Sequence, residues 1–194
     1  MFKANVRIQG KTKISFSKQV FENKEANETH DAFDKRTVLD KLHVDSKGKI
    51  VIPGIMIKRS LDGAAKFMGK IPGKGNATYT KHFLSGVQVM SDIDTGINKE
   101  DTKIEAISGA SDGVRGGSKR VTKNFPYLDD WKGELLLLIT DDIVNKETLK
   151  QAFGIAGTQI GIGRFRPING GNAGMFVVTD IEVTPIKDFS EVWG

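Results

Sequence analysis

Apolar and polar residues alternate in several short stretches of the chain, and this period of two predicts β-strands. The first stretch carries Val6 and Ile8, then Ile14 and Phe16, which indicates a strand or a pair of strands. The apolar run 135–139 indicates the best-buried strand. The other predicted strands cover residues 50–52, 83–90, 102–107 and 175–183.

Two further stretches repeat apolar residues at helical spacing. One starts at Pro53-Gly54 and stops at Gly69, and the other covers residues 145–156. Proline presets the backbone at a helix start, so we expect the amides near Gly54 to be free for an anion. The apolar positions are Ile57, Leu61, Ala64, Ala65 and Met68 in the first helix, and Leu149, Ala152, Phe153 and Ala156 in the second.

The order of these elements predicts an α+β fold. A strand, a helix, two or more strands, a second helix and a last strand give a βαββαβ plan, as in ferredoxin-like or RRM-like domains. We predict one domain over residues 1–194, with a polar excursion at 17–49 and an insertion at 70–133 that enlarges the middle.

Composition narrows the class of protein. The chain has 194 residues, no cysteine and a net charge of +5, so disulfides and thiolate metal sites are excluded and polyanion binding is favoured. The first residues lack the apolar core of a signal peptide, and the run 135–139 is too short to span a bilayer. We therefore expect a cytoplasmic protein that does not contact membranes.

The segment 161–176 combines five glycines with Arg164, Phe165 and Arg166. Bare backbone amides and guanidinium groups suit phosphate oxygens, and Phe165 would offer a flat face to a base. A tight turn in which the arginines cap helix carbonyls is the structural alternative. The segment is neither a Walker A loop nor a dinucleotide fingerprint, because no Gly-Lys-Ser/Thr ends it and it follows a helix and precedes a strand.

A second basic glycine-rich segment, 115–123, contains Arg115, Lys119 and Arg120 and no acidic residue. It would contact the same polyanion, or it would form a solvated hairpin tip in which Asp112 pairs with Arg115.

Val51-Ile52-Pro53-Gly54 before a helix with Lys58 and Arg59, the mid-chain basic loop and the late glycine loop together resemble the repeat-associated mysterious protein (RAMP) superfamily. That family includes backbone subunits of RNA-guided CRISPR effector complexes, and the overall texture is similar to a phage or prophage relative. The resemblance implies a thumb-like role for 115–123 and head-to-tail assembly along a strand. It assigns phosphate contacts to Lys58 and Arg59, and a cradle to Gly161, Gly163, Arg164, Arg166, Gly170 and Gly171. Neighbouring residues of a helix point in different directions, so we expect only one of Lys58 and Arg59 to face the ligand.

We predict a non-enzymatic protein that binds single-stranded RNA or DNA through its phosphates and forms a homo-oligomer or filament, with no cofactor, no metal and no catalytic residue. One alternative is a metal- or histidine-dependent ribonuclease that uses His30, Asp31, Asp34 and His43. Another is a protein that sequesters nucleotides or blocks a host effector by mimicry. We expect His82 to touch a phosphate or a base, and Phe125, Tyr127 and Trp131 to pack in the interior rather than stack on bases.

Overall fold

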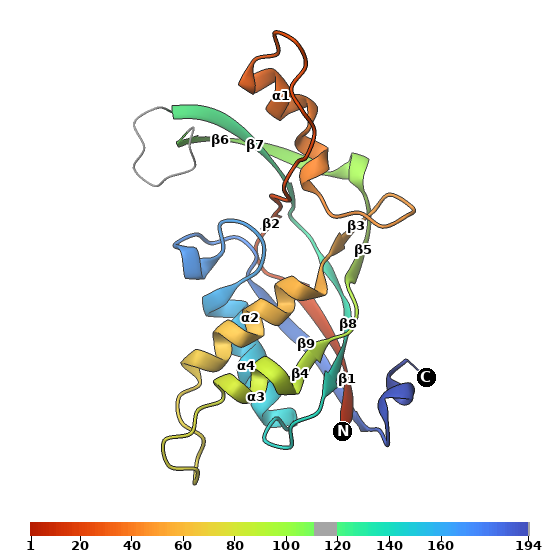
Figure 1. Ribbon diagram of the computed structural model, residues 1–194, viewed down its shortest axis with the longest axis vertical. Helices are drawn as coiled ribbons and strands as arrows, with labels where there is room; N and C mark the ends of the chain where they lie inside the picture. Colours follow the sequence, from red (N-terminus) through yellow and green to blue (C-terminus); the bar gives the residue numbers. More distant parts are fainter. Residues whose placement is uncertain (111–119, 194) are drawn as a thin grey trace.

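The computed structural model describes residues 1–110 and 120–193. The molecule is elongated, with a body of sheet and helices at one end and an arm at the other (Figure 1). The arm is formed by α1 (His30–Arg36), β6 (Lys103–Ala110) and β7 (Arg120–Leu128). Both termini lie at the far end of the body from this arm.

The body is built on a four-stranded antiparallel sheet with the order β4-β8-β1-β9. Its strands are β1 (Phe2–Gly10), β4 (Val87–Val89), β8 (Lys132–Ile139) and β9 (Phe176–Pro185). The first and last strands pair side by side, and the third lies between the first and second, which is the ferredoxin-like arrangement. The predicted α+β fold class is therefore confirmed.

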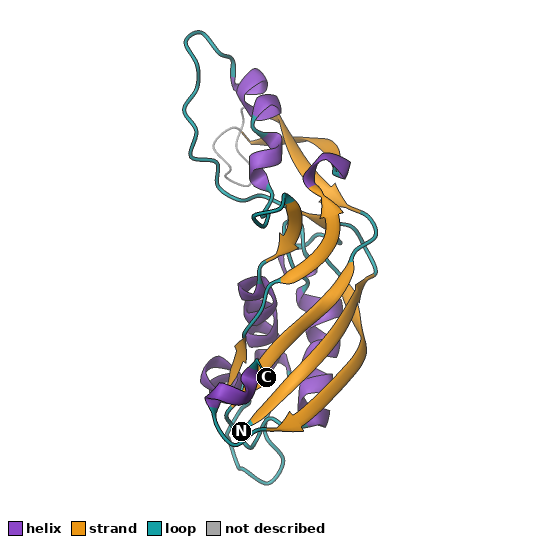
Figure 2. Ribbon diagram, turned by 90° about the vertical axis from the view of Figure 1, so that its right-hand side faces the viewer, coloured by secondary structure: helices purple, strands orange, loops and turns teal. Residues whose placement is uncertain are grey.

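Three helices cover one face of this sheet: α2 (Gly54–Phe67), α3 (Thr80–Gly86) and α4 (Lys146–Ile155) (Figure 2). Alternation along β1 directs Ala4, Val6 and Ile8 into the core beneath them, each at most 2% exposed. The helices supply their side chains at spacings of three and four, among them Ile57, Leu61, Leu149 and Phe153, all at most 1% exposed. In the part of the chain that the structure describes, no helix is long and apolar enough to cross a bilayer.

Two small sheets extend the body toward the arm. β3 (Lys49–Ile52) pairs with β5 (Ile93–Asn98), and β2 (Ile14–Ser15) pairs with β7 (Arg120–Leu128), which pairs with β6 (Lys103–Ala110). Four short helical turns and a π-helical turn complete the chain: η1 (Val38–Lys41), η2 (Lys99–Asp101), η3 (Ala156–Ile160, π-helical), η4 (Pro167–Asn169) and η5 (Phe189–Val192).

The polar excursion 17–49 is tied together by α1 (His30–Arg36). The Arg36 guanidinium donates to Glu22 at 2.7 Å and to Glu28 at 2.9 Å, which folds the loop before α1 back onto the helix. Thr29 caps the helix by accepting from the amide of Ala32 at 3.1 Å. These contacts fold the excursion on itself, and hydrogen bonds of Lys41 and Asp34 with Asn124 join it to β7.

One strand prediction was wrong in part, and one strand was not predicted. Residues 83–86 belong to α3, and the strand begins only at Val87; Phe83 and Val87 are both fully buried, so the apolar pattern does not mark where the helix ends. β5 was not predicted, since only Ile93 of its six residues is buried. β4 also shows that the expected insertion 70–133 contains a strand of the main sheet.

Candidate nucleic-acid interface

The glycine loop starts where α4 passes into the π-helical turn η3. Gly161 then reverses the chain with φ of 71°, and a Cβ there would lie 2.6 Å from Cδ of Pro167. Gly163 has φ of 73°, and a Cβ would lie 2.7 Å from the carbonyl oxygen of Ser15. Glycine is required at both turns because the backbone takes a left-handed conformation and packs against its neighbours.

The backbone amides of the loop are not a bare cradle, which corrects the prediction for Gly161, Gly170 and Gly171. The Gly161 amide donates to Ala156 at 2.7 Å, and the amides of Gly170 and Gly171 donate to Pro167 and Arg166 at 2.8 and 3.2 Å. These glycines shape the loop, and the side chains are left to contact a ligand. The other loop amides with a protein acceptor are those of Ile162, Arg164, Asn169, Ala173, Gly174 and Met175.

Arg164 lies between two aromatic rings. Its guanidinium is 4.4 Å from the ring centroid of Phe125 and 4.9 Å from that of Phe165. The two rings meet edge to face at 5.4 Å, so Phe165 packs on β7 and is only half-exposed, rather than offering an open face to a base. Contact with the rings buries part of the guanidinium and lowers the pKa of Arg164, which still remains charged. The arginine is thus held in place by the rings.

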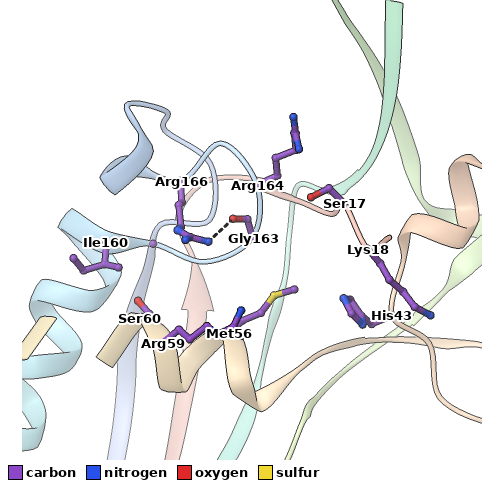
Figure 3. Close-up of a pocket in the computed structure, with 11 residues that line it drawn as sticks. Ser17, Lys18, His43, Met56, Arg59, Ser60, Ile160, Gly163, Arg164 and Arg166 are labelled. Carbon is purple, nitrogen blue, oxygen red and sulfur yellow. Dashed lines mark hydrogen bonds between the residues drawn. The ribbon is translucent and has the colours of Figure 1, made fainter. Parts of the chain in front are cut away.

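A pocket of about 190 Å³ joins the glycine loop to α2 and to the polar excursion. Figure 3 shows Met56, Arg59 and Ser60 on one side, the loop with Arg164 and Arg166 on the other, and Lys18 and His43 at the far end. The connection is made by β2, since Arg164 donates its amide to the Ser15 carbonyl at 2.8 Å. Segments more than 100 residues apart in sequence therefore share one cavity.

The pocket is positively charged. None of the described residues that line it is acidic. Lys18, Arg59 and Arg164 make no ion pair with any described residue, and Arg166 donates only to the carbonyl of Gly163, at 3.2 Å. Guanidinium groups that line one cavity and have no ion-pair partner among the described residues suit the oxygens of a phosphate.

His43 is a titratable group in this pocket. Burial is the main cause that lowers its pKa, and the charge of Lys18 lowers it further, whereas Asp92 acts in the opposite direction. The imidazole is therefore neutral near pH 7.

Lys58 does not face this pocket, which corrects the prediction for that residue. It is 8% exposed, and its Nζ donates to the Asp62 carboxylate and to the carbonyls of Phe83 at 3.0 Å and Leu84 at 3.1 Å. All three ammonium donors are thus used inside the protein. The amide of Gly54 is not free for an anion either, because it donates to Asp92 at 2.8 Å.

We expect Lys58→Met to lower the free energy of unfolding by about 2–3 kcal/mol, because the partly buried Asp62 carboxylate and the carbonyls of Phe83 and Leu84 lose the ammonium as a donor. Urea denaturation against Lys66→Met, which changes an exposed lysine of the same helix, measures the effect. RNA affinity of the folded variant should stay within about twofold of wild type. Unchanged stability together with weakened RNA binding would instead return Lys58 to the interface.

The mid-chain basic segment is only partly described. Arg115 and Lys119, with Asp112, lie outside the described residues. Arg120 is exposed at the start of β7 and is not one of the residues that line the pocket. A phosphate contact by these residues remains a prediction.

The described residues do not form the metal site that a metal-dependent ribonuclease would need. Among residues 1–110 and 120–193, no group of three or more histidine or carboxylate side chains could hold a metal ion. Asp34 pairs with Lys41 at 2.5 Å and accepts from the side chain of Asn124 at 2.9 Å, so it stabilises the arm. Only His43 of the proposed cluster lines the basic pocket, whereas His30 and Asp31 line a separate cavity beside β7.

The other singled-out side chains have structural roles. Nδ1 of His82 lies 2.7 Å from the Asp141 carboxylate. Burial acts to raise the pKa of Asp141, but hydrogen bonds from His82 and the Ile143 amide outweigh it and lower that pKa. Phe125 and Trp131 are at most 5% exposed, as the packing interpretation predicts. Tyr127 is half-buried beneath the ammonium of Lys13, which is 4.8 Å from its ring centroid.

Lys18 was missed by the sequence reasoning, and His43 was named only as part of the ribonuclease alternative. Both lie in the polar excursion, and no local pattern distinguishes Lys18 from the other exposed lysines of the chain. Only the pairing of β2 with β7 and the glycine loop brings this segment to the pocket.

No protein-family model and no curated protein sequence matches the chain. Several solved structures are similar to the chain in fold. A chain of a type III-B Cmr-beta complex bound to cognate target RNA is 15% identical with a TM-score of 0.59, over 94% of this chain and 60% of that chain. Cmr6 from Pyrococcus furiosus is 11% identical with a TM-score of 0.46, over 91% of this chain and 98% of that chain.

The chain has the ferredoxin-like fold that its sequence predicts and shares its fold with the first of these structures. It spans 60% of the length of that similar chain.

Proposed function

We propose that this protein binds single-stranded RNA through its phosphates, without cleaving it, and that the pocket between α2, the glycine loop and residues 17–18 is the contact site. The observation that carries the proposal is that Lys18, Arg59, Arg164 and Arg166 line one cavity, with no acidic residue among its described lining. A pocket that offers mainly positive charge favours contact with the phosphate backbone of the RNA over recognition of its base sequence.

The choice of RNA has its own support. The chain of similar fold with a TM-score of 0.59 was solved in a complex bound to cognate target RNA. A basic pocket with a cation packed on Phe125 and Phe165 suits a strand whose path is not fixed by a duplex. Head-to-tail assembly along the strand belongs to the same proposal and rests on the resemblance to RAMP subunits.

Binding should depend steeply on salt. If the four pocket cations each neutralise one phosphate, a plot of log K against log salt has a slope of about −2 to −3 for a single strand. Fluorescence anisotropy with labelled single-stranded RNA and DNA measures the slope, and light scattering on the same mixtures measures assembly. Absence of salt-dependent binding to RNA would reject the proposal, and a strict monomer with RNA bound would reject the assembly.

One observation keeps the ribonuclease as a second candidate. A neutral His43 beside Lys18 and the pocket arginines could accept a proton from a ribose hydroxyl. Gel analysis of the same RNA after prolonged incubation decides between the candidates. Intact RNA favours the binding protein, and cleavage that is lost in His43→Ala favours the enzyme.

A further inference from the structure

The pocket is small for a site that encloses a whole nucleotide. Its volume is about 190 Å³. Sites that bury drug-sized ligands measure roughly 300–1,000 Å³. The glycine side of the pocket is closely packed, because Gly161 and Gly163 approach a proline ring and a backbone carbonyl too closely to admit a side chain. The cavity therefore suits one compact anionic group.

The charge of the pocket exceeds that of an internal phosphate of RNA. A phosphodiester carries one negative charge, whereas Arg59 and Arg166 line the space between α2 and the loop and make no ion pair with any described carboxylate. A phosphomonoester carries about −1.5 to −2 at neutral pH and presents three strong acceptor oxygens. Two guanidinium forks match this group better than they match a diester.

We propose that the pocket holds a terminal phosphomonoester of the RNA strand, so that the protein binds the end of the strand at this site. The inference rests on the proposed function and adds the chemical group that the pocket selects. In Figure 3, Arg166 extends toward α2 while Arg164 points away from it, so Arg59 and Arg166 grip the terminal phosphate and Arg164 meets the next part of the strand.

The test compares three RNA oligonucleotides of one sequence with an internal dye. One carries a 5′-phosphate, one a 3′-phosphate, and one has hydroxyl groups at both ends. We expect one phosphorylated form to bind at least about tenfold more tightly than the hydroxyl form, as one strengthened charge-assisted contact implies. The form that gains affinity identifies the end.

Variants make the comparison specific. Arg59→Glu should reduce the preference for the phosphorylated end to less than about threefold, whereas Lys66→Glu, with the same charge change on an exposed position of α2, should keep it. Equal affinity for all three oligonucleotides would overturn the inference while leaving salt-dependent RNA binding intact. Loss of binding to every oligonucleotide would reject the proposed function itself.

A free nucleoside monophosphate serves as the competitor. It carries the same monoester without the strand, so it should displace the phosphorylated RNA only at much higher concentration. Displacement at equal concentration would overturn the assignment to an RNA end and would favour a protein that sequesters nucleotides.

Discussion

Replacing both loop arginines, in Arg164→Glu with Arg166→Glu, should weaken RNA binding by at least about 100-fold, because each charge-assisted contact to a phosphate contributes about 1.5–3 kcal/mol. The slope of log K against log salt should become shallower by about 1 to 2, since two fewer phosphates are neutralised. Anisotropy titrations across a salt series measure both quantities.

The matched control is Lys66→Glu with Lys146→Glu, which changes the net charge by the same amount. Both lysines are exposed, and neither lines the pocket. If that control loses as much affinity as the loop variant, overall charge rather than the pocket governs binding.

The loop arginines also make internal contacts, so stability must be followed at the same time. Arg164 stacks on two rings and Arg166 donates to Gly163, and their loss should cost only about 1–3 kcal/mol of unfolding free energy. An unfolded double variant would show that the loop arginines are chiefly structural. Arg59→Glu then tests the pocket independently, because Arg59 has no ion-pair partner among the described residues.

The second large effect is expected for Gly174→Ala. Gly174 has φ of +69°, and a Cβ there would lie 1.8 Å from the carbonyl oxygen of Ile162. The left-handed backbone costs an L-residue about 1–2 kcal/mol, and the contact with a backbone atom forces the loop to move, so we expect a total loss of about 3–5 kcal/mol. The moved loop should also lose RNA affinity.

Gly170→Ala is the control for this change. Gly170 has a similar φ of +79°, but a Cβ there would meet nothing within 4 Å. Its cost should be only about 1 kcal/mol. Urea denaturation measures the free energy of unfolding of both variants. Equal losses would show that the left-handed backbone, and not the close approach to the Ile162 carbonyl, is the reason that residue 174 must be glycine.

The sequence predicts the α+β plan because the sheet and its helices are amphipathic over local windows. The pattern of Ile57, Leu61 and Ala64 defines the buried face of α2 without any knowledge of its partner, and the run 135–139 identifies β8. The short elements were harder. α3 and β4 share one apolar stretch, and β5 has a single buried side chain, so neither shows enough periods to be recognised.

Some of the residues named from the sequence lie together in the structure. Arg59, Arg164 and Arg166 line one pocket, and their contact with a ligand stays a prediction. The glycines of the loop were correctly placed, but their amides bond to the loop itself, because a chain that turns this tightly brings its own carbonyls within reach.

The sequence by itself determined that a basic, glycine-rich segment follows the last helix and that only one of two adjacent lysine and arginine side chains on α2 could face it. Only the tertiary structure decided that Arg59 is the exposed one, because Lys58 finds Asp62 and two carbonyls of α3 in the interior. It alone also brought Lys18 and His43 to the pocket. The physical reason is that burial and periodicity are recorded in neighbouring residues, whereas the partners of a charged side chain are set by strand pairing between segments far apart in the chain.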